Sequence, residues 1–359
     1  MHPLEVSVFG PGVGECVLLA PRPDYWIVVD SCRVDGVPVA LRYIEDQGHD
    51  PAAVVREVIC THWHDDHHDG IADVLRRCVS ARFWCSAALR SEEFLTLAGS
   101  ARRQYDKKHG VDEMAEVLKI IHERRAKGVR AAAVGPQWAD ESKRLVREPD
   151  FSLWSLSPSA ATLTRAHNEF AELVPKLKSP KRRLAANEAN DTAVVLHLET
   201  ESHGSVLLGS DLEIQTDPTR GWTAAFSSFR GQGLRRAHTY KVAHHGSKNG
   251  HAPEIWDSMV EPTPTVLLTP FRSCRLPGIE DLKRIRQAHE GATYITANPR
   301  GAKPRRRSNS VEKTMRMVSS KRRLERTPGG QLRVRVRADG TRSVEMIGTA
   351  FEVGTAETA

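Results

Sequence analysis

Three histidines and two aspartates fill five of the six positions from 62 to 67 in this 359-residue chain, which there reads His-Trp-His-Asp-Asp-His. The segment follows the apolar, β-branched run Val54–Cys60. Residues two apart on an extended chain project to the same side, so His62 and His64 can bind one ion. Imidazole and carboxylate are preferred ligands of zinc-type ions, and a catalytic site leaves one position open for water. The spacing therefore predicts a metal site; a solvated polar turn is the alternative.

Asp66 and His67 stand where the chain turns toward an expected helix, Ile71–Arg77, and they can reach a second ion. A carboxylate that could bridge two cations comes later in the chain. The apolar strand expected at Val206–Gly209 leads directly to Asp211. By itself, an aspartate after a strand is more often a turn residue. Asp211 is a candidate metal ligand only because the histidine motif at residues 62–67 precedes it.

Paired histidines follow another expected strand, Tyr240–Ala243. His244 and His245 are succeeded by Gly246, which lets the backbone come close to neighbouring groups. One histidine of such a pair can be purely structural. In this order along the chain, however, the three features together indicate a site for two metal ions. Their spacing does not decide which of the two histidines is the ligand.

The chain resembles the metallo-β-lactamase-fold hydrolases. It is most similar to the subgroup that includes the hydrolase domain of the bacterial DNA-uptake channel protein, with the choline-phosphate esterases as further relatives. The resemblance covers roughly residues 5–297 and implies an α/β fold of four layers, an αββα sandwich with the site at one edge of the two sheets. It rests on five places in the sequence: Gly10–Glu15, Val28–Asp30, His62–Gly70, Asn190–Leu196 with Gly209–Asp211, and His244–Ser247.

The resemblance also implies a cofactor, two divalent metal ions, with Zn²⁺ as the first choice and Mn²⁺ as the alternative. The ligands carried over by position are His62, His64 and Asp211 for the first ion, and Asp66, His67, Asp211 and His245 for the second. Asp30 would lie behind the site and orient the ligand histidines. The chain departs from the family at one place. Many members supply a third histidine to the first ion where this sequence has Asn190 and Asp191, either of which could substitute.

The implied mechanism is hydrolysis by water activated at the metal ions. Asp66 would orient the attacking water while binding metal, and His244 would donate a hydrogen bond to the developing oxyanion or protonate the leaving group. Ser247 and Lys248 are candidate contacts for an anionic substrate, and ordinary loop residues are the alternative. A phosphodiester, in nucleic acid or a nucleotide, is the favoured substrate. Two other hypotheses are a small phosphorylated or ester substrate, and a subunit of a multi-protein complex, for example in antiviral defence.

Strands and helices are expected to alternate in two consecutive halves. The first half has expected strands at Glu5–Phe9, Cys16–Ala20, Tyr25–Val29 and Arg82–Cys85 and expected helices at Val39–Gln47, Ser91–Ala98 and Asp112–Lys127. The second half has expected strands at Ala193–Leu198, Val266–Thr269 and Thr293–Thr296 and an expected helix at Ile279–His289. Residues 165–189 are expected to form a basic, proline-punctuated loop. Three aromatic side chains are candidates for stacking on unpaired bases, with core packing as the favoured alternative: Trp222, Phe226 and Phe229.

Basic charge is concentrated near the C-terminus. Residues 300–337 contain fourteen Lys and Arg and only two acidic residues, which gives this segment a net charge of +12. Because the net charge of the whole chain is +7, the remaining residues together carry about −5. This predicts two parts, a hydrolase-like domain over residues 1–298 and a basic C-terminal extension over 299–359 that ends in a β-hairpin around Asp339-Gly340. Nucleic acid is the expected partner of residues 300–337. A solvated tail is the alternative, and a protein partner or homo-oligomer stays open.

Composition limits the setting of the protein. No apolar run approaches the ~20 residues that cross a bilayer, so no membrane partner is expected. The first residues show no export signal. Six cysteines are scattered without a Cys-x-x-Cys pair, which suits buried reduced thiols and a cytoplasmic protein.

Overall fold

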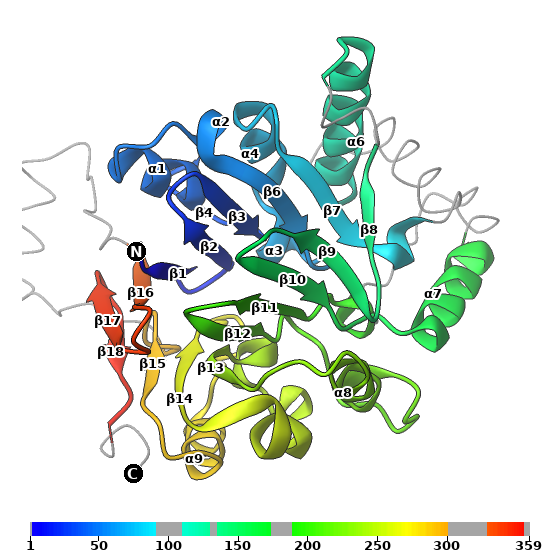
Figure 1. Ribbon diagram of the computed structural model, residues 1–359. Coiled ribbons are helices and arrows are strands. Elements are labelled where there is room, and N and C mark those ends of the chain that lie inside the picture. The colour runs from blue at the N-terminus through cyan, green and yellow to red at the C-terminus, as the bar shows by residue number, and fades with distance from the viewer. Residues whose placement is uncertain (1, 91–109, 130–134, 174–188, 301–328, 355–359) are drawn as a thin grey trace, which may run out of the picture.

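The computed structural model describes residues 2–90, 110–129, 135–173, 189–300 and 329–354. Over these described ranges, two eight-stranded mixed sheets pack against each other, and helices lie on the outer side of each (Figure 1). This is the four-layer αββα sandwich that the resemblance implies, so the predicted fold class is confirmed. The helix expected at Ser91–Ala98 lies outside the described residues.

The first sheet combines antiparallel and parallel pairing. From β17 to β3 neighbouring strands are antiparallel, and from β3 to β8 they are parallel. In spatial order the strands are β17 (Arg342–Ile347), β16 (Gly330–Val336), β1 (Leu4–Gly10), β2 (Cys16–Arg22), β3 (Tyr25–Val29), β6 (Val55–Cys60), β7 (Arg82–Ser86) and β8 (Gln137–Ala139).

The second sheet has the same mixture. Strands β9 to β12 are antiparallel, β12 to β15 are parallel, and β18 closes the sheet antiparallel to β15. In spatial order the strands are β18 (Phe351–Glu352), β15 (Thr293–Ile295), β14 (Val260–Leu268), β13 (Ala237–Lys241), β12 (Gly204–Leu208), β11 (Leu196–Thr200), β10 (Phe151–Ser155) and β9 (Lys143–Arg147). A small separate sheet pairs β4 (Arg33–Val34) with β5 (Val37–Pro38).

Helices cover the two outer faces (Figure 1). The α-helices are α1 (Val39–Asp46), α2 (Pro51–Val54), α3 (Asp65–His68), α4 (Ile71–Arg77), α6 (Gly110–Ala126), α7 (Ala160–Leu173), α8 (Gly221–Gly231) and α9 (Ile279–Gln287). Short 3₁₀ turns are η1 (Ala87–Arg90), η4 (Ala189–Thr192), η5 (Ala243–Gly246) and η6 (Lys248–Gly250), and η7 (Ile255–Met259) is a π-turn. Within the described ranges, none of these helices has the length and apolar character needed to cross a bilayer.

Alternation along the strands builds three hydrophobic cores from the residues that the structure describes. On β2, Val17 and Leu19 face the second sheet, whereas Leu18 and Cys16 face the helices of the first sheet. This follows from the two-residue period of a strand, which sends neighbouring side chains to opposite faces. Because both faces of each sheet are covered, the central strands read as continuous apolar runs rather than alternating ones.

Several expectations need correction. Residues 165–173 are helical, since α7 extends to Leu173, so only the later part of the expected basic loop stays open, and residues 174–188 lie outside the described range. Ala166 on α7 packs into the core of the first sheet. Trp222 and Phe229 are 1% and 4% exposed in the core of the second sheet, so they pack there and present no face to bases. Phe226 packs against the same core from a partly buried position.

The expected C-terminal hairpin exists, and it is built into the sandwich. β16 pairs with β1 over seven residue pairs, from Leu4 with Val336 to Gly10 with Gly330. β17 then pairs with β16, and β18 joins the second sheet beside β15. The strands after residue 329 therefore belong to the same sheets as the predicted hydrolase-like part.

Arg124 joins α6 to the rest of the fold. Its side chain is buried and donates to the backbone carbonyls of Leu75, Cys78 and Ala81, at and beyond the C-terminal end of α4. These carbonyls have no partner within α4, because the last turn of a helix leaves its acceptors free. A single guanidinium thus satisfies the end of one helix from the side of another.

Replacing Arg124 with Met is expected to lower the free energy of unfolding by about 2–4 kcal/mol, because buried carbonyls lose a charged donor while the volume is nearly kept. Chemical denaturation followed by circular dichroism measures the change. Arg125→Met, on the exposed side of the same turn, serves as the matched control and should stay within about 0.5 kcal/mol of the parent. Equal effects of the two substitutions would contradict the role given to Arg124.

Candidate metal centre

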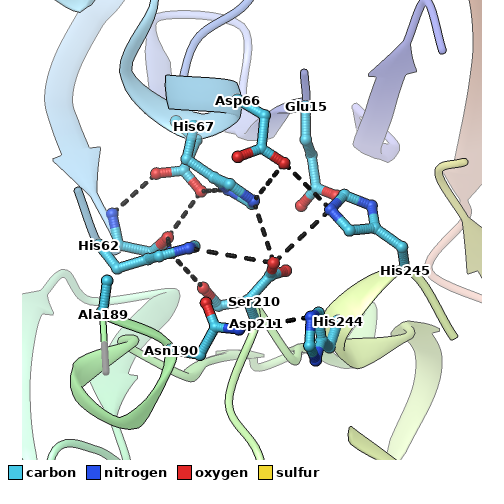
Figure 2. A network of polar contacts seen from close by, with 12 residues as sticks. Glu15, His62, Asp66, His67, Ala189, Asn190, Ser210, Asp211, His244 and His245 are labelled. Atoms are coloured by element: carbon cyan, nitrogen blue, oxygen red, sulfur yellow. Dashed lines mark hydrogen bonds and ion pairs between the residues drawn. The ribbon is translucent and has the colours of Figure 1, made fainter. Parts of the chain in front are cut away.

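The predicted site residues lie in loops that leave neighbouring strands at one edge of the sandwich. In the first sheet, Asp30 follows β3 and the segment His62–His67 follows β6, its parallel neighbour. In the second sheet, Asp211 follows β12 and His245 follows β13, again a parallel pair. The carboxyl ends of parallel strands meet at the same edge, which is why residues so distant in sequence converge (Figure 2).

Four of these side chains form one compact group. The ligand atoms of Asp66, His67, Asp211 and His245 all lie within 4.8 Å of one another. His67 Nε2 is 3.7 Å from Asp66 Oδ2 and 3.5 Å from Asp211 Oδ2. His245 Nε2 is 3.3 Å from Asp66 Oδ2 and 3.6 Å from Asp211 Oδ2 (Figure 2). This is the set that the resemblance implies for the second ion.

A second group shares Asp211 with the first. The ligand atoms of His62, His64 and Asp211 lie within 4.8 Å of one another. His62 Nε2 is 3.9 Å from Asp211 Oδ2, and the ring centroids of His62 and His64 are 4.9 Å apart. His62 is buried, whereas His64 is half-buried at the rim. All six predicted ligands are therefore brought together, and one carboxylate is common to both groups.

The donor atoms of this cluster suit a divalent metal ion. Within the described part of the chain, no hydrogen-bond partner faces His62 Nε2, His67 Nε2 or Asp211 Oδ1, although all three atoms are buried. Buried polar atoms are normally satisfied, so three orphaned atoms pointing into one volume call for a further partner. Imidazole nitrogens and carboxylate oxygens are the ligands that such an ion prefers. The cluster can bind a divalent metal.

Electrostatics within the cluster are strongly coupled. Burial acts to raise the pKa of Asp211, but His245, His67 and His62 outweigh it and hold the pKa well below its usual range. Burial likewise acts to lower the pKa of His67, and the carboxylates of Asp211, Asp66 and Asp30 raise it well above the ordinary value. Burial and the neighbouring His67 lower the pKa of His62. The carboxylates therefore stay ionised and need positive charge beside them.

Asp30 supports two of the ligand histidines from behind. Its carboxylate accepts hydrogen bonds from His67 Nδ1 at 2.8 Å, from the Thr61 backbone N–H at 2.7 Å and from Thr61 Oγ1 at 2.7 Å. Thr61 Oγ1, whose hydrogen is given to Asp30, accepts in turn from His62 Nδ1 at 3.0 Å. Both rings thus direct Nδ1 at these acceptors and turn Nε2 toward the cluster, where it could bind a metal ion. Burial raises the pKa of Asp30 above its ordinary value, although the hydrogen bonds from His67 and Thr61 act to lower it.

Glu15, Asp30 and His67 also place ligand atoms within 4.8 Å of one another. This third group does not have the character of a metal site. His67 Nδ1 already donates to Asp30, and Glu15 Oε2 accepts from Thr269 Oγ1 at 2.5 Å. The group is a hydrogen-bonded support of the ligands rather than an open set of donors.

The structure separates the two adjacent histidines. His245 points into the cluster, whereas His244 turns to Glu213 and Asn190, with Nδ1 3.1 Å from Glu213 Oε1 and Nε2 3.3 Å from Asn190 Nδ2. Both histidines have left-handed backbone conformations, with φ of 46° and 50°. Non-glycine residues rarely adopt this region, and such strain is concentrated at functional sites.

The remaining predicted residues lie nearby with different partners. Asn190 Nδ2 donates to Glu213 Oε1 at 2.7 Å, and its buried Oδ1 has no hydrogen-bond partner among the described residues. Asp191 joins neither metal group, because its carboxylate contacts Gln215 and Arg220. Ser247 Oγ donates to Asn249 Oδ1 at 2.5 Å, and Lys248 is exposed in the next turn.

Sequence reasoning missed three charged residues of the site. Glu213 pairs with His244, and Glu15 forms a buried ion pair with Lys241 next to His245. Glu213 lies two residues after Asp211, and this closeness to a predicted ligand could have marked it as a candidate site residue. Glu15 and Lys241 lie in motif segments but carry no local sign of their pairing, because only the folded chain brings them together.

Comparison with solved structures finds metallo-β-lactamase-fold proteins. The metallo-β-lactamase fold protein YhfI from Bacillus subtilis is 14% identical, with 82% of this chain and 96% of that chain covered and a TM-score of 0.42. A Cronobacter sakazakii metallo-β-lactamase is 16% identical, covering 67% and 75%, with a TM-score of 0.37, and the metallo-β-lactamase SMB-1 is 14% identical, covering 67% and 76%, with a TM-score of 0.36. No family model matches the chain, and no curated protein is significantly similar to it in sequence. Similarity of this extent says nothing about activity, for which the residues of the site are the evidence.

Asp30→Asn is expected to weaken metal binding by roughly 10- to 100-fold, because the neutral amide no longer draws a proton to Nδ1 of His67 and, through Thr61, of His62. Titration of the metal-depleted protein with Zn²⁺ against a chromogenic chelator measures the affinity. Asp24→Asn, in the exposed turn before β3, is the control and should bind metal like the parent. Parental affinity in Asp30→Asn would remove the support assigned to this carboxylate.

Proposed function

We propose that this chain is a metal-dependent hydrolase that acts through water activated between two divalent ions, with a phosphodiester as its substrate. One observation carries the proposal. Asp211 Oδ2 lies 3.5 Å from His67 Nε2 and 3.6 Å from His245 Nε2 in one group, and 3.9 Å from His62 Nε2 in the other. A carboxylate common to two neighbouring groups is what a bridging ligand requires. Zn²⁺ is the proposed metal and Mn²⁺ the alternative, given the mixed imidazole and carboxylate donors.

Two such ions, when bound, lower the pKa of a water molecule toward neutrality and neutralise charge that develops on a phosphoryl oxygen. The residues of the chain then have to place that water and the substrate. The side chain of Asp66 is 12% exposed against 4% for Asp211. We assign it the second task of accepting a hydrogen bond from the water and directing its lone pair toward phosphorus.

His244 is the proposed proton donor to the leaving oxygen. Glu213 Oε1 lies 3.1 Å from Nδ1 and orients the ring. The other nitrogen, Nε2, faces the Asn190 amide at 3.3 Å. Because the amide nitrogen is a donor, Nε2 accepts in this contact and carries no proton there. A leaving oxygen that takes the place of the amide would receive a proton from Nε2 only after that nitrogen has been protonated by solvent. Ser247 and Lys248, on the turn after His245, are the proposed contacts for a non-bridging phosphate oxygen.

Nucleic acid is the proposed form of the substrate, through residues 300–337. The part of this segment from 301 to 328 lies outside the described residues and contains ten of its fourteen cations. Two of the described cations are used by the fold, because Arg333 pairs with Glu345 at 3.1 Å and Arg335 with Glu5 at 3.1 Å. Polyanion binding is therefore assigned to residues 300–328 rather than to β16.

Both ends of this basic segment are anchored beside the turn that leads into the metal cluster. Thr296 Oγ1 donates to the carbonyl of Gly10 at 2.9 Å, just before the segment begins. After it, Gly330 pairs with Gly10 and lies so close to the Thr296 carbonyl that a side chain there has no room. The same turn ends at Glu15, whose N–H donates to the carbonyl of Asp66 at 2.9 Å. This attachment supports a polyanion held next to the site.

Two finer points belong to the same proposal. Asn190 at the position of a third histidine, together with the paired histidines before Gly246, supports the likeness to the hydrolase of the DNA-uptake channel protein. All six cysteines are free, and five of them are buried. Buried thiols without disulfides support a reducing, cytoplasmic setting.

Asp211→Asn is expected to lower turnover of bis(p-nitrophenyl) phosphate by at least about 10²- to 10³-fold, because a bridging ligand stabilises both ions in the transition state. The parent should bind about two ions per chain, measured by elemental analysis beside the rate. Asp46→Asn, exposed on α1, is the matched control with parental rate. A parental rate in Asp211→Asn would overturn the site, and hydrolysis of p-nitrophenyl esters without any diester cleavage would overturn the substrate class.

Replacing six basic residues with Gln is expected to weaken DNA binding and to reduce its dependence on salt concentration. A variant that makes fewer phosphate contacts releases fewer counterions from the DNA when it binds. The six are Arg305, Arg306, Arg307, Lys321, Arg322 and Arg323. The slope of log K against log salt should fall by up to about 4 to 5 in fluorescence-anisotropy titrations. A control with Arg56, Arg125 and Lys127 replaced, all exposed elsewhere, should keep the slope. Unchanged slopes in both variants would exclude residues 300–328 as the nucleic-acid contact.

A further inference from the structure

A buried ion pair lies directly behind His245 and is not part of the ligand set. Lys241 is the last residue of β13 and is 0% exposed, while Glu15 lies between β1 and β2 and is 2% exposed. Lys241 Nζ contacts Glu15 Oε2. Removing two charges from water is costly, and a buried pair contributes less to stability than its attraction suggests. Such a pair beside a candidate metal centre therefore calls for an explanation other than stability.

The pair is connected to His245 through one hydroxyl group. Thr269 Oγ1 donates to Glu15 Oε2 at 2.5 Å, so its own lone pairs are left to accept. His245 Nδ1 lies 3.2 Å from Thr269 Oγ1 and 3.2 Å from the Thr269 carbonyl oxygen, and both of these are acceptors. The proton of the ring is thereby held on Nδ1. Nε2 keeps its lone pair and faces Asp66 and Asp211.

The same glutamate also holds the opposite half of the site. Its backbone N–H donates to the carbonyl of Asp66 at 2.9 Å, at the start of α3. The preceding Gly14 has φ of 89°, and a Cβ there would lie 2.7 Å from the Cys32 side chain and 3.4 Å from that same carbonyl. The turn can therefore approach Asp66 only with glycine at this position. Glu15 thus contacts Asp66 by its main chain and, through Thr269, His245 by its side chain.

We propose that Glu15, with its charge balanced by Lys241, is the positioning residue of the second metal ion. It fixes His245 as an Nε2 donor and holds the Asp66 segment at the correct distance, as Asp30 does for His67 and His62. The inference rests on the proposed metal centre and goes beyond it, since it assigns the second ion a further support besides Asp30, which holds one ligand of each ion. Loss of Glu15 therefore affects the ion held by Asp66 and His245 and leaves the ion held by His62 and His64 in place.

The test measures metal affinity in the full chain, without reference to turnover. Metal-depleted parent and variants are titrated with Co²⁺ against a chelator, and the visible absorption spectrum of bound Co²⁺ reports ligand geometry. Glu15→Gln is expected to weaken one of two equivalents by roughly 10- to 100-fold, a typical effect of removing a group that orients a ligand. The weakened equivalent should be the one that is lost in His245→Ala. The other should change by less than about threefold.

A double variant separates positioning from folding. Glu15→Gln and Lys241→Met each leave one buried partner uncompensated and are expected to lower the thermal midpoint of the metal-depleted protein. Glu15→Gln combined with Lys241→Met removes both charges, so it should recover most of that midpoint and still bind the second ion weakly. Thr269→Val should weaken the same equivalent with the ion pair intact, and Thr269→Ser, which keeps the hydroxyl, should retain parental affinity.

A matched control is available in the first sheet. Glu57 is fully buried and paired with Arg82, and it accepts further hydrogen bonds from Tyr25 and Trp84. None of these partners is a predicted metal ligand. Glu57→Gln should lower the thermal midpoint while leaving both Co²⁺ affinities unchanged. The proposal is overturned if Glu15→Gln binds both ions as tightly as the parent, loses both equally, or regains affinity in the double variant. A parent that binds no Co²⁺ overturns the metal centre itself, which is a distinct result.

Discussion

Negative charge buried at one edge of the sandwich is the constraint around which the site is built. Asp30, Asp66 and Asp211 share a small volume that solvent barely reaches. Buried carboxylates need compensation, and the imidazoles of His67 and His245 lower the pKa of both Asp66 and Asp211. A divalent cation at the same place offers that compensation with a charge that does not depend on pH. The orphaned Nε2 and Oδ1 atoms face the volume where it would sit.

The fold creates this concentration of charge by placing strand ends side by side. Parallel pairing of β3 with β6, and of β12 with β13, puts the loops after all four strands at one edge. The backbone of these loops is strained, because four non-glycine residues have left-handed φ between 46° and 58°: Asp30, Ser210, His244 and His245. Buried apolar strands on either side hold these conformations in place. Rigidity of the sheets is therefore what allows strained loops to present ligands from both halves of the chain.

Local patterns in the sequence predicted much of this arrangement, and tertiary pairing accounts for what they did not predict. The apolar runs predicted β1, β2, β3 and β6 within one or two residues, and the six residues predicted as ligands from the motifs lie together in the fold. Strands β8 to β10 were missed. β9 has only two apolar residues, Leu145 and Val146, and they lie between basic ones, so its sequence resembles a surface segment. In the sequence, Lys241 resembles the polar last residue of an apolar strand, and Glu15 resembles a turn residue. Nothing in their local sequence indicates that they form an ion pair. The choice between His244 and His245 likewise depended on which ring the folded chain turns inward.

The supports behind the predicted ligands make the two histidines of the second candidate ion position, His67 and His245, unequal. His67 rests directly on the Asp30 carboxylate, and His62 reaches the same carboxylate through Thr61, so one buried acid orients ligands of both positions. His245 has a neutral threonine against its ring, and the charge behind that threonine is already balanced by Lys241. A carboxylate in direct contact makes an imidazole a stronger donor than a hydroxyl does. We therefore expect His67 to be the stronger donor of the two toward a metal ion, because its support is a carboxylate and that of His245 is a neutral hydroxyl group.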